Sequence, residues 1–534
     1  MEENKTRDKK ESTLDLRILI PGVAVCFAFV IWCMLDSEHA DASMSFIMAF
    51  LSEKFGWLYL IAVFAFVVFL LGLAFSKLGK VKLGRDDEEP EYKTSSWLFM
   101  MFSAGMGIGL VFWSVGEPMS LYLNPPIQPG STIAAAQEAM PLTFMHWGIT
   151  PWACYGVVGL ILAYFQYRKG RSALLGSCLA FGGARSSGTY DKLALVVDIL
   201  AVIVTIFGVS TSLGMGALQI SAGLNYAFGI PNTIVTKLIV VAVATVVFVA
   251  SGMAGIGRGM KRLSDLNISL AAILCVLVFL SGSMVFVLDY FAESVGAYLQ
   301  NFIQMSLWSD AFGEAPGFLS SWTVFYWAWW ISWTPFVGSF VAHISRGRTI
   351  REFISCILLA PAIISFIFMA VMGGNAISFD LGGNPAIANA MQGDVSYALF
   401  ALFESLPISN SIPFFAAGLS VIALVLIFVF FVTSADSATF ICAQQTCGGS
   451  MKPPVKIKAV WGLVLAAVSA MLLCAGGLSS LQTVSIVVAF PFIFVIFALM
   501  VSFIRVASHE FDPPGNSDDE EKEPEPLSAF PVQP

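Results

Sequence analysis

Residues 321–340 read SWTVFYWAWWISWTPFVGSF and contain no charged side chain. A run of this length suits a membrane-spanning helix, since about 20 apolar residues cross the ~30 Å hydrocarbon core of a bilayer. The whole chain has the same character: 57% of its 534 residues are hydrophobic and 12% are charged, against about 25% charged in an ordinary soluble domain. This composition excludes a soluble enzyme, a disordered chain and a nucleic-acid-binding protein. It predicts an all-α polytopic membrane protein.

Similar apolar runs recur along the sequence and predict twelve transmembrane helices. They centre on residues 18–35, 57–76, 97–115, 143–165, 194–222, 234–252, 267–288, 321–342, 353–373, 413–433, 458–476 and 483–504. We therefore expect a cytoplasmic N-terminal tail over 1–16, a twelve-span domain over 17–506 and an acidic, disordered cytoplasmic tail over 507–534.

The positive charges support this topology. Of the 28 Lys and Arg residues, only Lys54 and Lys237 fall in the segments that would lie outside if both termini are cytoplasmic. Because Lys and Arg concentrate in cytoplasmic loops, the alternation predicts a cell-membrane protein with both ends inside. The outer segment around residues 287–308 differs from the other loops, because its apolar residues recur at helical spacing. It predicts an amphipathic helix lying in the interface between lipid and water.

Aromatic residues gather in two of the runs. The first set is Trp329, Trp330 and Trp333, and the second is Trp147, Trp152 and Tyr155. An interfacial aromatic belt is one interpretation, but a belt needs only one or two rings at each helix end. Two walls of rings inside a membrane protein favour a quaternary ammonium ligand, which cannot donate a hydrogen bond and is worth about 2 kcal/mol against each desolvated ring face.

Glycines at 105, 107 and 109 interrupt the third run. No strand precedes them, which excludes a dinucleotide fingerprint. The glycines then allow either close helix packing or local unwinding that frees backbone groups. Thr433 and Ser434 in the tenth run favour an oxygen cage for Na⁺ together with such freed carbonyls. The alternative is that the two hydroxyls bond only their own helix backbone.

Other polar residues give weaker signals. Asp198 and Asp436 are interpreted as caps or intracellular gate pairs near span ends. Glu117 is expected to close the third span at the outer surface. His146 is interpreted as a satisfied structural histidine, with a proton relay as the alternative. The segment 345–352 is a charge cluster whose role is topological or that of a gating ion pair.

At four stretches the sequence resembles the betaine/choline/carnitine transporter family. These are SAGMGIGLVFW (103–113), HWGITPWACY (146–155), the tryptophan-rich stretch 321–340 with AHISRGRTIREF (342–353) after it, and FFVTSADSATF (430–440). They follow one another in the family's order, and the twelve-span layout covers nearly the whole chain.

The resemblance implies a LeuT-like fold of two inverted five-helix repeats, spans 3–7 and 8–12, assembled as a homotrimer through the interfacial helix. It implies a substrate site formed by Trp147, Trp152, Tyr155, Trp329, Trp330, Trp333, Met106, Gly107 and Gly109. It implies one Na⁺ site at Ser103, Met106, Phe430, Thr433 and Ser434. It also implies a possible second Na⁺ site at Thr205 and Phe336, although Val209 lacks the hydroxyl expected there.

Together these features predict Na⁺ symport of a quaternary-ammonium zwitterion, first of all glycine betaine, by alternating access. Choline-preferring relatives tend to carry Asp where this chain has Gly109, which favours betaine. The alternative is a sodium-independent or proton-coupled carrier or exchanger of carnitine, choline or a related onium compound. No motif of a membrane enzyme is present, and no cofactor is expected beyond Na⁺ as the coupling ion.

Overall fold

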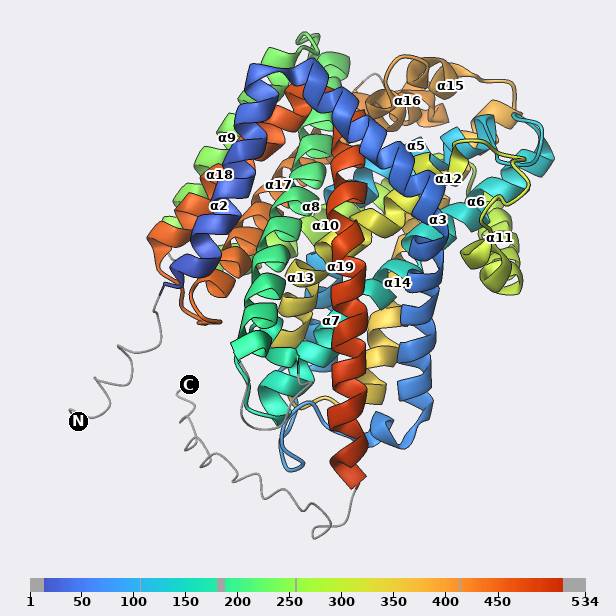
Figure 1. Ribbon diagram of the computed structural model, residues 1–534. Coiled ribbons are helices and arrows are strands. Elements are labelled where there is room, and N and C mark those ends of the chain that lie inside the picture. The colour runs from blue at the N-terminus through green and yellow to red at the C-terminus, as the bar shows by residue number, and fades with distance from the viewer. Residues whose placement is uncertain (1–13, 106, 180–187, 255–256, 413, 512–534) are drawn as a thin grey trace.

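The computed structural model describes residues 14–105, 107–179, 188–254, 257–412 and 414–511. Within these ranges all regular secondary-structure elements are helices, and Lys82 and Thr349 form the one isolated β-bridge. The helices assemble into an elongated bundle (Figure 1). Ten helical stretches of the described chain are long and apolar enough to cross a membrane. The all-α polytopic fold is therefore confirmed, whereas the number of twelve crossings stays a prediction.

Each expected span coincides with a helix or a pair of helices. The unbroken ones are α2 (Leu16–Leu35), α3 (Ser37–Phe75), α8 (Gly188–Phe228), α9 (Ile234–Ala254), α10 (Gly257–Ser281), α13 (Thr323–Ile344), α14 (Ile350–Leu381), α17 (Phe415–Thr446), α18 (Val455–Ala475) and α19 (Leu478–Ala507). The start of α2 and the end of α19 lie at the same end of the bundle (Figure 1).

Two spans are broken in the middle. The third consists of α4 (Thr94–Gly105) and α5 (Ile108–Leu123), so the glycine run does interrupt the helix. The fourth consists of α6 (Ile133–Trp147) and α7 (Ile149–Ala163), which meet at Gly148. A Cβ at Gly148 would lie 2.7 Å from the ring of Phe366, so only glycine fits this second break, which the sequence analysis did not predict.

Two contacts between a helix of the first half of the chain and a helix of the second half each have a counterpart in which the roles of the two halves are swapped. The pair α7–α13 has its counterpart in α14–α5, and the pair α8–α19 has its counterpart in α17–α10. This exchange is what two structurally equivalent five-helix units would produce. It places α13 against α7, α8 and α19, so the tryptophan-rich helix is enclosed by protein.

The segment between the two halves forms α11 (Met284–Leu307), which packs against α6 and α14 as a separate helix. Tyr290 of α11 donates its hydroxyl to the carbonyl of Ala136 in α6. Short helices α12 (Phe318–Ser321), α15 (Ala386–Met391) and α16 (Ala398–Ser405) cover the end of the bundle opposite the start of α2 (Figure 1).

The described structure reaches into the expected C-terminal tail. Ser508–Phe511 form a 3-10 helix after α19. Glu510 in it pairs with Arg168 at 2.8 Å and Lys169 at 2.9 Å. The first residues of that segment are therefore held against the end of α7 by ion pairs.

Candidate substrate and ion site

The six aromatic residues expected at the substrate site come together between α6, α7 and α13. The ring centroids of Trp147 and Trp330 are 5.0 Å apart with planes at 74°, and those of Trp329 and Trp330 are 4.5 Å apart and stacked. Tyr155 meets Trp330 edge-on at 6.3 Å. None of the six is more than 4% exposed, which excludes an interfacial belt. We refer to these six residues as the aromatic box.

The indole N–H groups of the three box tryptophans in α13 donate to neighbouring helices. Trp329 donates to the hydroxyl of Ser212 at 3.2 Å, and Trp333 donates to the carbonyl of Gly208 at 2.9 Å. Trp330 donates to the carbonyl of His146 at 3.0 Å. The N–H edges are thereby satisfied, and the electron-rich faces remain for contacts within the box.

Two polar groups of the box have no such partner. The indole nitrogen of Trp152 and the hydroxyl of Tyr155 are buried without a hydrogen-bond partner in the described part of the chain. A buried donor left unpaired costs about 1–3 kcal/mol. A polar ligand in the box would relieve this cost.

The glycine run lines the box on one side and faces α17 on the other. A Cβ at Gly105 would lie 2.5 Å from the ring of Trp152, and a Cβ at Gly109 would collide with Trp329. Gly107 lies closer to α17, where its Cβ would be 3.5 Å from the hydroxyl of Ser434. Met106, and the side chain of Ser103, lie outside the described residues, so their expected roles stay predictions.

The break also exposes a helix N-terminus. Gly107 is the N-cap of α5 and provides no side-chain acceptor for the first N–H groups of that helix. These N–H groups and the helix dipole favour a negative charge at this point.

The expected Na⁺ ligands of α17 lie on a continuous helix. The hydroxyl of Thr433 is 3.0 Å from the carbonyl of Val429 and 3.2 Å from that of Phe430. Asn267 of α10 donates its amide to the same hydroxyl at 3.3 Å. The amide oxygen of Asn267 is buried without a hydrogen-bond partner in the described residues. Asn267 was not among the expected site residues, and its only signal in the sequence is a lone amide in an apolar run.

The second expected ion site is only partly formed by polar groups. The hydroxyl of Thr205 donates to the carbonyl of Ala201 at 2.7 Å. Val209 is fully buried and offers no oxygen. Phe336 packs edge-on against Trp333 at 5.6 Å. Because α8 and α13 pack together, Thr205 and Phe336 lie on adjacent helices, and a second ion stays a prediction.

Comparison with known proteins gives the chain a family. A model of the betaine/carnitine/choline family transporters matches residues 17–512. The chain belongs to this family. It is therefore a multi-pass membrane transporter and not an enzyme.

Several named relatives of this transporter match over nearly their full length. The chain is 42% identical over 491 residues to the glycine betaine transporter OpuD of Bacillus subtilis, covering 91% of this chain and 93% of the relative. It is 40% identical over 501 residues to a probable glycine betaine transporter of Desulfitobacterium hafniense, covering 93% and 98%. It is 40% identical over 500 residues to an ectoine/hydroxyectoine transporter of Virgibacillus pantothenticus, covering 93% and 97%.

Glu117 of this transporter does not close the third span at a surface. It lies within α5, and its side chain is fully buried. Its carboxylate contacts His146, whose other ring nitrogen is 3.1 Å from the hydroxyl of Thr323. Both nitrogens of His146 therefore have partners, as expected of a structural histidine.

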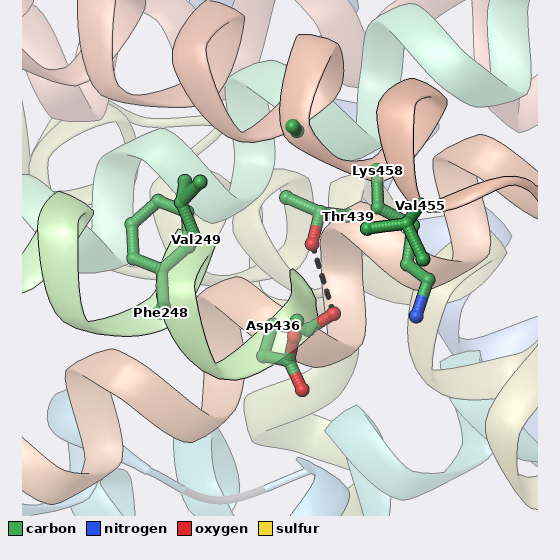
Figure 2. Close-up of a pocket in the computed structure, with 8 residues that line it drawn as sticks. Phe248, Val249, Asp436, Thr439, Val455 and Lys458 are labelled. Carbon is green, nitrogen blue, oxygen red and sulfur yellow. Dashed lines mark hydrogen bonds between the residues drawn. The ribbon is translucent and has the colours of Figure 1, made fainter. Parts of the chain in front are cut away.

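The two aspartates differ in environment. Asp198 accepts the backbone N–H of Gly176 at 2.7 Å and so holds the segment that follows α7. Asp436 lies inside α17 and not near its end, so the interpretation as a cap is wrong for this residue. It lines a small pocket with Thr439 and Lys458 (Figure 2), where the hydroxyl of Thr439 donates to the carbonyl of Asp436 at 2.9 Å.

The charge cluster at 345–352 of the transporter joins two loops. Arg348 lies over the ring of Trp97 at 4.6 Å, donates to the carbonyl of Tyr92, and pairs with Glu352. Arg346 pairs with Glu88 at 2.5 Å. The cluster therefore ties the end of α13 to the segment between α3 and α4.

Proposed function

We propose that this transporter imports glycine betaine together with Na⁺ by alternating access. The observation that carries the proposal is the convergence of buried aromatic rings from α6, α7 and α13 at centroid distances of 4.5–6.3 Å. The faces of such rings attract a trimethylammonium group without needing a fixed carboxylate. The glycine betaine transport named for two relatives supports this substrate class.

The other end of the substrate has its own acceptor region. A zwitterion carries a carboxylate, which we place against the freed N–H groups at the start of α5. The unpaired donors of Trp152 and Tyr155 lie in the same box and supply further hydrogen bonds. Choline has a neutral hydroxyl in place of the carboxylate, so the same groups would gain less from it than from a charged acceptor.

Na⁺ is proposed to bind the oxygens of Phe430, Thr433 and Ser434, with the free amide oxygen of Asn267 as an additional ligand. Gly107 lies against Ser434, so an ion here would also order the break between α4 and α5. Coupling has an energetic reason: a zwitterion gains nothing from the membrane potential, whereas each added cation gains about 2.3 kcal/mol per 100 mV.

Transport requires the aromatic box to open. The rings of Trp147 and Trp330 touch each other in this structure, so a guest between them requires α6 and α13 to separate. We propose rocking of one helix bundle against the other about this site. We further propose a cell-membrane location with both termini cytoplasmic, and a homotrimer formed through α11.

Ectoine is the second candidate substrate. The relative named for ectoine and hydroxyectoine transport is 40% identical, as is one of those named for glycine betaine. Ectoine is also a zwitterion, but it has no trimethylammonium group to fill the box. Competition of unlabelled ectoine against labelled betaine ranks the two substrates.

The deciding experiment is uptake of labelled glycine betaine into reconstituted vesicles with Na⁺ outside, with K⁺ outside, or with a proton gradient. We expect uptake only with Na⁺. Trp330→Leu should raise the apparent KM at least about tenfold, since about 2 kcal/mol is lost with one desolvated ring. The matched control is Trp57→Leu, because Trp57 is 52% exposed on α3. Equal uptake with K⁺ or with a proton gradient would contradict Na⁺ symport. An unchanged KM in Trp330→Leu would contradict the proposal that the aromatic box binds the substrate.

A further inference from the structure

A single buried carboxylate lies behind the aromatic box. Glu117 of α5 is fully buried, and three donors from two other helices surround it. One oxygen is 2.6 Å from Nδ1 of His146. The other accepts the indole N–H of Trp147 at 2.6 Å and the hydroxyl of Tyr326 at 2.5 Å. Glu117 thereby joins α5 to both α6 and α13.

The groups held by Glu117 touch the box directly. Trp147 is itself a wall of the box, and Tyr326 stacks on Trp330 with centroids 5.8 Å apart. Tyr326 also meets Trp147 edge-on at 5.6 Å. A shift of the carboxylate would therefore change the angle between two of the box walls.

His146 links Glu117 to Trp330 as well. Its imidazole stacks on Tyr326 at 4.7 Å, and its backbone carbonyl accepts the N–H of Trp330. Trp147, Trp330 and Tyr326 are therefore all bonded either to Glu117 or to the residue that Glu117 holds. No other carboxylate within the described ranges is bonded to a ring of the box.

We propose that Glu117 is a positioning residue of the substrate site: it sets the orientation of Trp147 and Tyr326 through its hydrogen bonds, and not through its charge. The inference rests on the proposed onium site. We place Glu117 outside direct contact with the substrate, because both of its carboxylate oxygens are occupied by hydrogen bonds to His146, Trp147 and Tyr326.

The variant Glu117→Gln tests whether the hydrogen bonds of Glu117 or its negative charge orient the rings. The indole N–H of Trp147 and the hydroxyl of Tyr326 share one carboxylate oxygen, and an amide oxygen in that place has two lone pairs for them. The amide nitrogen then donates to Nδ1 of a neutral His146. Glu117→Gln thus keeps all three hydrogen bonds without the negative charge, whereas Glu117→Ala loses all three.

The test measures betaine uptake in vesicles for Glu117→Ala, Glu117→Gln and Tyr326→Phe. The exposed Glu314→Ala serves as the control. We expect Glu117→Ala to raise the KM for betaine about tenfold or more, because several hydrogen bonds to a buried charge are lost. The Na⁺ concentration for half-maximal uptake should stay unchanged, which a general collapse of the fold would not allow. Glu117→Gln should restore the KM to within about threefold of the wild type.

Two results overturn the proposal: an unchanged KM in Glu117→Ala, or a KM in Glu117→Gln as high as in Glu117→Ala, which would assign the role to charge. If Glu117→Ala does not insert into the membrane, Tyr326→Phe decides, since it removes one hydroxyl and leaves Glu117 in place. A KM raised about threefold in this variant supports the proposal, and an unchanged KM contradicts it. Absence of betaine uptake by the wild type is a failure of the proposed function and is recognised separately.

Discussion

Gly109 packs so closely against the indole of Trp329 that any side chain at residue 109 would collide with the ring. The same Cβ would also lie 3.2 Å from Trp147, so Gly109 faces both walls of the aromatic box. The backbone of α5 therefore packs directly against two tryptophans from different helices.

This packing predicts the effect of adding one methyl group. Gly109→Ala should raise the KM for betaine at least about tenfold, because Trp329 must shift out of its place in the box. The control is Gly418→Ala in α17, where no atom lies within 4 Å of the added Cβ. Uptake kinetics in vesicles measure both variants. Equal KM values for the two would show that Trp329 has no fixed position in transport.

An acidic group at the same residue should change specificity. Gly109→Asp should lower betaine uptake and admit choline, because choline is a net cation and gains from a nearby carboxylate. Gly109→Asn is the matched variant, of the same size but without charge. Labelled choline uptake should appear in the first variant only. Choline uptake in both, or in neither, would contradict the electrostatic explanation.

The hydroxyls of α17 should control the sodium response. Thr433→Ala combined with Ser434→Ala should raise the Na⁺ concentration for half-maximal uptake several-fold, while the protein remains inserted. The matched control is Ser420→Ala with Thr439→Ala, since those hydroxyls donate only to carbonyls of their own helix. If both double variants respond to Na⁺ like the wild type, the cage does not bind the coupling ion.

A substitution of Asn267 in α10 tests the same proposed Na⁺ site. Asn267→Leu has a similar volume but removes the donor to Thr433 and the unpaired amide oxygen. We expect weaker Na⁺ dependence with a smaller change in the KM for betaine at saturating Na⁺. Asn301→Leu in α11 is the control, because its amide donates within its own helix. A normal Na⁺ response in Asn267→Leu would exclude this ligand.

Substitutions in the charge cluster at 345–352 distinguish a purely topological role of these residues from a structural one. Arg348 is 4% exposed and holds Glu352, Thr94 and the ring of Trp97. Arg348→Ala should lower the melting temperature of the purified transporter by several degrees, because the buried guanidinium is removed and its contacts with Glu352 and the ring of Trp97 are lost. Arg346→Ala removes the same charge from a half-exposed side chain and should have less effect. Equal melting temperatures would leave only the topological role.

The aromatic box could be predicted from sequence because its residues are concentrated in two short stretches with strong physical preferences. The glycines at 105, 107 and 109 indicated either close packing or a break before α5, since glycine weakens a helix locally, and the structure shows the break. Helical spacing puts Trp329, Trp330 and Trp333 on one face of α13, whereas the meeting of these rings with Trp147, Trp152 and Tyr155 was implied by the family resemblance.

Glu117 could not be placed in the same way. Its partners His146 and Tyr326 are 29 and 209 residues away in the chain, and no local pattern indicates that they meet. Asn267 was missed for a related reason, because its role depends on α10 packing against α17. The break at Gly148 lay in an apolar run whose average character is helical, and glycine is required there because a Cβ would meet the carbonyl of Phe144 and the ring of Phe366.

Gly148 divides the fourth span between Trp147 and Trp152. These two indoles consequently belong to separate rigid segments joined by a single pair of backbone torsions. A small rotation at that joint would swing one indole relative to the other by several ångströms at the ring edge while leaving both helices intact. The width of the aromatic box would then depend on the backbone torsions of Gly148 alone, and binding of a substrate would not require either helix to unfold.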